Sequence, residues 1–181
     1  MSGKSPAMCR KEMLVKELRI LVAYDASKSA QEAWNYCREL MELIADRCEG
    51  RYTILLLTVE QLPACSLFSS TNIWKKECEK VHRNQLKQHE KVVAEMKKSS
   101  LDPICLKNKF VTLDERDEPL EDSERKKLIA KVILKEQREG KYGTLVMGRR
   151  GMTRSDAYLF GSVSQQILQD ARNCVIWVLC R

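Results

Sequence analysis

The residues of this chain whose spacing suggests chemistry lie in one glycine-containing stretch, Leu145–Val163. Gly148 is followed by Gly151 after two residues and by Gly161 after nine more, with Ser162 directly behind the last glycine. A short apolar run leads into the first glycine, and a helical pattern of apolar residues begins after the last one. The stretch therefore connects a predicted strand to a predicted helix.

A loop in this position is suited to binding phosphate. Glycines let backbone amides approach a ligand closely, and the start of a helix adds unpaired N–H groups and the positive end of its dipole. The hydroxyls of Ser162 and Ser164 are candidate donors to phosphate oxygens, and Arg149, Arg150 and Arg154 supply positive charge. The alternative is a surface loop whose glycines only form turns and whose Ser162 only caps a helix. The position directly after a strand favours phosphate binding.

Three stretches together resemble a known family. The spacing G-x2-G-x9-G-[ST] after a hydrophobic strand resembles the nucleotide-binding signature of the universal stress proteins. Near the start, LRILVAYDASKSAQEA resembles the opening strand, aspartate and first helix of that family. Near the end, VSQQILQDARNCVIWVL resembles its last helix and strand. The resemblance covers about Leu18 to Leu179.

The resemblance implies a site for ATP or AMP, with or without Mg²⁺. It implies that Asp25 lies beside the adenine and that the backbone of Val59 contacts the base. By residue type alone, Asp25 is more often a turn or helix-cap residue. The residues predicted to bind the nucleotide are Asp25, Val59, Gly148, Gly151, Gly161, Ser162, Val163, Ser164, Arg149 and Arg154.

The chain departs from the family pattern in two places. Ala26 stands where the family often has glycine. After the third predicted strand the family usually has a glycine shortly before a proline, whereas Thr112–Pro119 contains no glycine and belongs to a longer acidic insert. Because of the second departure, the family pattern does not determine how tightly the ribose side of the site closes in this chain.

Apolar runs alternate with helical patterns along the chain. The runs are Leu18–Tyr24, Tyr52–Val59, Ile104–Val111, Thr144–Met147 and Asn173–Cys180. Helices are predicted from Ser29, over Ile73–Ser100, over Leu128–Arg138 and from Ser162. This alternation predicts an α/β protein: a single Rossmann-like domain over residues 18–181, with a five-stranded parallel sheet and helices on both faces. Residues 1–17 are predicted to form a flexible arm. Asp25 and Gly148 follow strands one and four, which are expected to be neighbours where the strand order reverses.

Composition restricts the classes of function. Among 181 residues, 44% are hydrophobic and 31% charged, no apolar run is long enough to cross a membrane, and no signal-peptide core is present, which together predict a soluble cytoplasmic protein. The net charge of +7 comes from lysines scattered along helices, which makes a solvated surface a better interpretation than nucleic-acid binding. The eight cysteines form no C-x-x-C pair and are expected to be buried free thiols.

Other chemistry is poorly supported. Cys78 and His82 have the i, i+4 spacing of metal ligands, but two ligands do not make a site, so a partly exposed helix face is expected there and no metal. The acidic residues around Pro119 are interpreted as a solvated loop that opens a helix. No Walker lysine pattern and no kinase or hydrolase signature accompanies the glycine loop, so no enzyme activity is expected beyond a slow, incidental ATPase.

The sequence leaves two main hypotheses for function. The first is an adenine-nucleotide-binding stress protein that acts as a sensor or binding module toward a protein partner that the sequence does not identify. The second is a nucleotide-independent interaction or chaperone-like protein that keeps the motif as architecture. The last predicted strand is apolar on both faces and must be covered; pairing with a second copy would cover it, and the resemblance implies such a homodimer.

Overall fold

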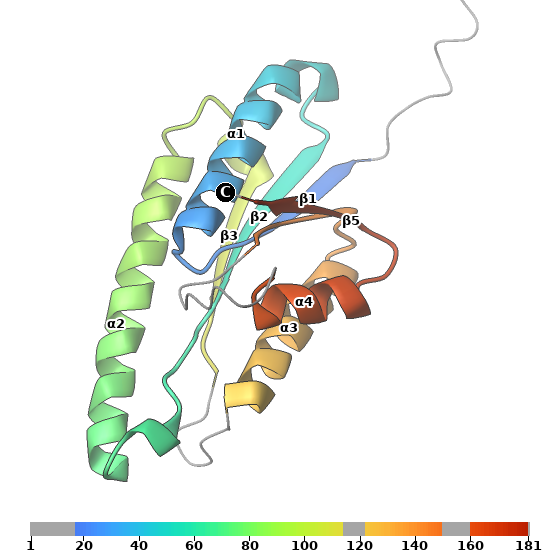
Figure 1. Cartoon of the computed structure of the whole chain (residues 1–181). Helices are drawn as coiled ribbons and strands as arrows, with labels where there is room; N and C mark the ends of the chain where they lie inside the picture. Colours follow the sequence, from blue (N-terminus) through green and yellow to red (C-terminus); the bar gives the residue numbers. More distant parts are fainter. Residues whose placement is uncertain (1–16, 114–121, 150–159, 181) are drawn as a thin grey trace, which may run out of the picture.

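The computed structural model describes residues 17–113, 122–149 and 160–180, and shows a five-stranded sheet with four α-helices (Figure 1). The predicted arm therefore lies almost entirely outside the described residues. In chain order the elements are β1 (Leu18–Ala23), α1 (Lys28–Cys48), β2 (Tyr52–Val59), α2 (Thr71–Met96), β3 (Leu106–Val111), α3 (Asp122–Glu139), β4 (Thr144–Gly148), α4 (Ser162–Asp170) and β5 (Val175–Leu179). Short 3-10 helices occur at Cys65–Leu67 and Pro103–Cys105. The predicted α/β fold with a parallel five-stranded sheet is confirmed.

The strand order is β3-β2-β1-β4-β5, and every neighbouring pair is parallel. The chain therefore builds the sheet outward from β1 on one side, then returns to the other side of β1 with β4 and β5. In the register, Val22 of β1 lies between Leu56 of β2 and Val146 of β4. The loops that follow β1 and β4 consequently leave the sheet side by side, as predicted for a point where the strand order reverses.

Each face of the sheet is covered by two helices, with a separate core on each side (Figure 1). On the α1 and α2 face, Ile20 and Ile54 of the strands pack with Trp34 and Met41 of α1. On the α3 and α4 face, Leu21 and Leu145 belong to a second buried cluster. Adjacent residues of one strand point to opposite faces, so strands covered on both faces are apolar at almost every position.

Some predicted boundaries are wrong, for local reasons. The third strand begins at Leu106 rather than Ile104, because Asp102 caps a 3-10 helix through a bond from the Ile104 amide and Pro103 opens that helix. The third helix begins at Asp122 rather than Leu128, and its first turn contains Asp122 and Glu124, whose charges suit the positive helix end. The second helix, α2, covers Thr71–Met96 rather than Ile73–Ser100, and Ser70 caps its start.

The expectation of a partly exposed face on α2 is right for His82 and wrong for Cys78. Cys78 is buried beside Leu62 and Trp74, whereas the His82 side chain is 39% exposed. His89, two turns further along, is also buried, and its Nδ1 is hydrogen-bonded to Thr58 Oγ1 of β2 at 2.8 Å. The polar side of this helix therefore reaches into the core.

The burial of His89 predicts a stability that depends on pH. Burial lowers the pKa of His89, while the Asn108 side chain acts in the opposite direction. A histidine whose pKa is lower in the folded state contributes stability above its unfolded pKa of about 6.5, and this stability is lost as the pH falls below that value. We expect the free energy of unfolding, measured with urea, to decrease between about pH 7 and 5 and to decrease less in His89→Gln. Identical pH slopes in the two proteins would contradict this assignment.

Candidate functional site

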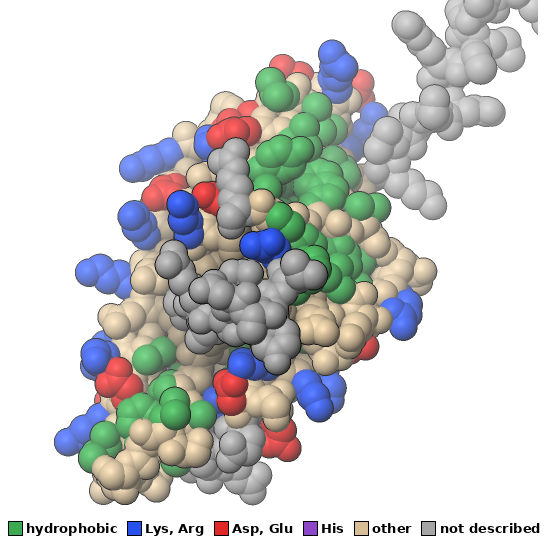
Figure 2. All heavy atoms as spheres, viewed as in Figure 1, with side chains coloured by type: hydrophobic (Ala, Val, Ile, Leu, Met, Phe, Trp, Pro, Cys, Tyr) green, Lys and Arg blue, Asp and Glu red, His purple; other side chains and the backbone are tan. Residues whose placement is uncertain are grey.

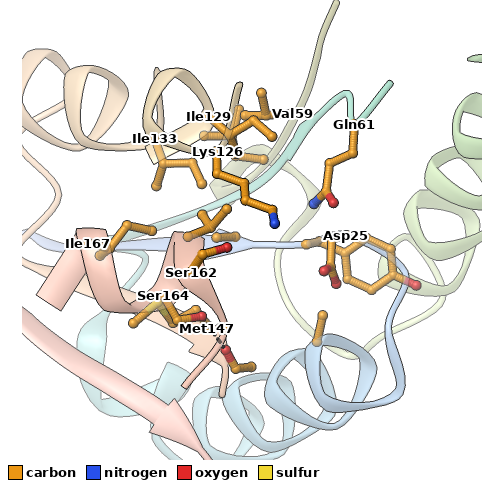
Figure 3. Close-up of a pocket in the computed structure, with 17 residues that line it drawn as sticks. Asp25, Val59, Gln61, Lys126, Ile129, Ile133, Met147, Ser162, Ser164 and Ile167 are labelled. Atoms are coloured by element: carbon orange, nitrogen blue, oxygen red, sulfur yellow. Dashed lines mark hydrogen bonds between the residues drawn. The ribbon is translucent and has the colours of Figure 1, made fainter. Parts of the chain in front are cut away.

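A cleft opens at the carboxyl ends of strands β1, β2 and β4 (Figure 3). Its volume is about 700 Å³ with its open mouth included. Five segments line it: the end of β1 with the start of α1, the end of β2, α3, the end of β4, and α4 with Gly161 before it. These segments are far apart in sequence and meet because β1 pairs with both β2 and β4.

Most of the predicted binding residues line this cleft. They are Asp25, Val59, Gly148, Gly161, Ser162, Val163 and Ser164. Arg149 follows Gly148 but is not among the residues that line the described cleft. Gly151 and Arg154 lie outside the described residues. The described lining therefore unites the glycine motif with the two residues that the resemblance assigned to the base.

Asp25 has a structural role in addition to its place in the cleft. Its Oδ1 accepts a hydrogen bond from the Ser27 amide at 3.0 Å, which closes a tight turn around Ala26. Ser27 then caps α1 by accepting from the Ala30 amide at 3.2 Å. The turn role expected from the residue type is thus present, and the same turn holds the carboxylate at the cleft.

Gly148 is required by a close approach between two backbones. A Cβ at this position would lie 2.4 Å from Ser29 Oγ and 2.8 Å from the Ala30 amide nitrogen. Gly148 thus lets the start of α1 pass directly over the end of β4. The sequence predicted that Gly148 lets a ligand approach the backbone closely. In the structure, the group that approaches Gly148 is the start of α1.

Three hydrogen bonds fix the two ends of the glycine loop. The Arg149 amide donates to the Leu179 carbonyl at 2.9 Å, and the Gly161 amide donates to the Arg149 carbonyl at 3.0 Å. The buried Ser164 hydroxyl donates to the Gly148 carbonyl at 3.1 Å. The proton of Ser164 is therefore already used within the protein, and of the two serine hydroxyls only that of the exposed Ser162 is left as a donor from this helix end.

The start of α4 brings backbone N–H groups to the cleft. Gly161 is the N-cap residue and gives no side-chain cap, in contrast to Ser27 at α1. The first amides of an α-helix have no acceptor within the helix, and those of Ser162, Val163 and Ser164 stand at the cleft. Unpaired N–H groups at the positive end of a helix dipole attract an anion.

Several lining residues were not singled out from the sequence. Lys126 extends from α3 into the cleft toward the ends of β1 and β2, and Ile129 and Ile133 form an apolar wall behind it (Figure 3). Gln61 follows β2. Tyr24 donates its hydroxyl to Gln31 at 2.8 Å, and burial raises its pKa to about 12, so it carries no charge near neutral pH. Lys126 could not be distinguished in the sequence from the other scattered lysines.

Residues 18–178 match the sequence model of the universal stress protein family. The chain belongs to this family. Its fold is similar to that of the hypothetical protein MJ0577 (TM-score 0.63, 18% identity, 92% of this chain and 98% of that one). It is also similar to UspA from Lactobacillus plantarum (TM-score 0.56, 15% identity, 91% and 99% covered). A third similar structure is a universal stress protein in complex with cAMP (TM-score 0.56, 14% identity, 91% and 98% covered). No match was found among curated proteins.

The described residues contain neither a membrane-spanning helix nor a metal-binding cluster. No helix there is both long and apolar enough to cross a membrane. Within the same ranges, no group of three or more histidine, cysteine, aspartate or glutamate residues is arranged to hold a metal ion.

The departure from the family at Ala26 has a measurable cost. Ala26 has a φ of 62°, in the left-handed region that favours glycine. Because an L-residue pays about 1 kcal/mol or more to adopt this conformation, we expect Ala26→Gly to raise the free energy of unfolding by about 1 kcal/mol in urea titrations. Ala45→Gly within α1 is the matched control and should lower it by about 1 kcal/mol. An equal loss in both variants would show that the turn does not strain Ala26.

Proposed function

We propose that this universal stress protein binds an adenine nucleotide, ATP or AMP with or without Mg²⁺, and acts as a cytoplasmic sensor or binding module. The observation that carries the proposal is the open start of α4, whose uncapped amides face the same cleft as the Lys126 side chain. A phosphate group there would receive hydrogen bonds from the backbone and a charge from Lys126, whose Nζ is also paired with Asp122 Oδ2 of the same helix.

The apolar part of the cleft suits a base. Val59 of β2 and the wall formed by Ile129 and Ile133 offer an apolar slot for a flat ring, and Asp25 and Gln61 offer hydrogen-bonding groups beside it. The structural neighbour in complex with cAMP supports the choice of an adenine nucleotide, since its fold is the same.

Binding rather than catalysis is the function that these residues support. The described lining of the cleft holds one carboxylate, Asp25, and no histidine or cysteine. General acid–base and nucleophilic catalysis most often use histidine, cysteine or carboxylate groups, and a nucleophile is commonly activated by a base within hydrogen-bonding reach. Any hydrolysis of ATP would therefore be slow and incidental. Bound nucleotide would change the affinity for a protein partner by binding two states of the protein differently.

Nucleotide binding is tested by calorimetric titration with ATP and adenosine. Gly161→Val places an apolar group beside the first amides of α4 and should abolish ATP binding. Lys126→Met should lower the affinity for ATP about tenfold, because a charged hydrogen bond is lost, and leave adenosine nearly unchanged. Gly143→Val is the control, since a side chain there meets open space outside the cleft. Wild-type affinity in a folded Gly161→Val protein would contradict the proposed site.

We also propose that β5 joins two copies into a homodimer. This strand is at the edge of the sheet and pairs only with β4 among the described strands. Val175 is 58% exposed, and Trp177 is only partly buried. The ring centroids of Trp177 and the exposed Tyr36 are 6.3 Å apart. Figure 2 shows hydrophobic side chains gathered over this edge. An exposed apolar edge strand is a template for pairing with another chain.

A charge on this edge is expected to separate the dimer. Sedimentation analysis should show a dimer for the natural protein and a monomer for Val175→Lys, because two lysines would face each other across the interface. Ile104→Lys is the matched control: Ile104 is 86% exposed at the opposite edge of the sheet, next to β3. A dimer that persists in Val175→Lys and is lost in Ile104→Lys would move the interface to the β3 edge.

A further inference from the structure

A second cavity lies on the other side of the strand end that borders the nucleotide cleft. It opens between the end of β2, the first half of α2 and the residues after β3, and measures about 1520 Å³ with open solvent included. It shares no described lining residue with the first cleft. Val59 and Gln61 line the nucleotide cleft, whereas Glu60 between them lines this second cavity.

Glu60 is a buried carboxylate that is only half paired. Its side chain is 1% exposed, and Oε1 is hydrogen-bonded to His82 Nδ1 at 2.6 Å. Its other oxygen, Oε2, is buried and has no hydrogen-bond partner among the residues that the structure describes. Leaving a buried charged group without a donor is costly, and folded proteins rarely do so. Because Glu60 lines the cavity, this unpaired oxygen directly behind the cavity wall points to a ligand that donates hydrogen bonds.

The neighbours of Glu60 hold it in place. The Glu60 amide donates to the Val111 carbonyl at 2.8 Å. The Gln85 side chain of α2 binds both backbone groups of Gln61, accepting from its amide at 3.0 Å and donating to its carbonyl at 2.7 Å. The rings of Phe110 and His82 meet edge to face, with their centroids 5.8 Å apart. The carboxylate is thus fixed before any ligand arrives, which favours binding.

The remaining lining describes the body of the ligand. Leu62, Trp74 and Leu113 form apolar walls, and the indole Nε1 of Trp74 already donates to the Pro63 carbonyl at 2.8 Å. At the rim, Glu79 and Arg83 face each other at 4.0 Å and are both largely exposed, and Lys75 is an exposed cation beside them, so solvent screens all three charges. Glu60 is the buried carboxylate of this lining and is shielded from solvent, so its charge outweighs the screened charges of the rim in the choice of ligand.

We propose that this cavity binds a small organic ammonium ion, a primary amine with an apolar body. The ammonium group would donate to Glu60 Oε2 and supply the opposite charge, while the apolar body packs against Leu62, Trp74 and Leu113. A bare metal ion fits less well, because the described residues offer no cluster of three or more suitable ligands. The site does not depend on nucleotide binding.

The test is calorimetric titration of nucleotide-free protein with three primary amines: n-butylamine, phenethylamine and tryptamine. Each amine is compared with the neutral alcohol of the same shape: 1-butanol, 2-phenylethanol and tryptophol. We expect at least one amine to bind about tenfold or more tightly than its alcohol, since the alcohol lacks the charge. The same amine should bind about tenfold more weakly to Glu60→Gln.

Glu79→Gln is the matched control, because Glu79 is a carboxylate in the same cavity but is 71% exposed. This variant should change the affinity by about twofold or less. The proposal is overturned if no amine binds at millimolar concentration, if amine and alcohol bind equally, or if a folded Glu60→Gln protein keeps the affinity for the amine. The comparison of amine with alcohol on the natural protein decides the matter even if Glu60→Gln does not fold.

Discussion

The parallel pairing of β1 with β4 is the interaction on which the rest of this structure depends. It joins Ile20 to Thr144 and Ala23 to Met147 in register, although more than a hundred residues separate the two strands in the chain. The pairing brings the Asp25 turn and the described ends of the glycine loop, Gly148 and Gly161, to one place at the end of the sheet. It also forces the start of α1 over the end of β4, where only a glycine fits, at position 148. The cleft follows from this arrangement.

The polarity of the cleft depends on how each helix begins. Ser27 caps α1 with its side chain, so the amides there are partly satisfied within the protein. Gly161 leaves the start of α4 uncapped, and Ser164 uses its hydroxyl to fix that helix to the carbonyl of Gly148. One helix end is thereby closed and the other is held open beside Lys126. We infer that the open end is where an anion binds.

Much of the fold could be predicted because it depends on patterns of neighbouring residues in the sequence. Buried parallel strands such as Tyr52–Val59 are apolar at nearly every position, and the glycine spacing after Thr144–Met147 marks the loop. The residues that α3 adds to the cleft, and the burial of Glu60 against α2, could not be predicted from such patterns. Lys126 reaches the cleft and Glu60 becomes buried only because distant elements pack around them, and nothing in their neighbouring residues distinguishes them from solvated charges. The start of α3 was missed because its first turn is charged rather than apolar.

The measurement that tests the central proposal most directly is the identity of any nucleotide that the purified protein carries. The protein is denatured, and the released small molecules are analysed by mass and by absorbance. We predict an adenine nucleotide, either present at near one per chain or taken up when ATP or AMP is added to the folded protein. Finding none, with no uptake at millimolar ATP, would contradict nucleotide binding and would leave the glycine loop as an element of the architecture alone.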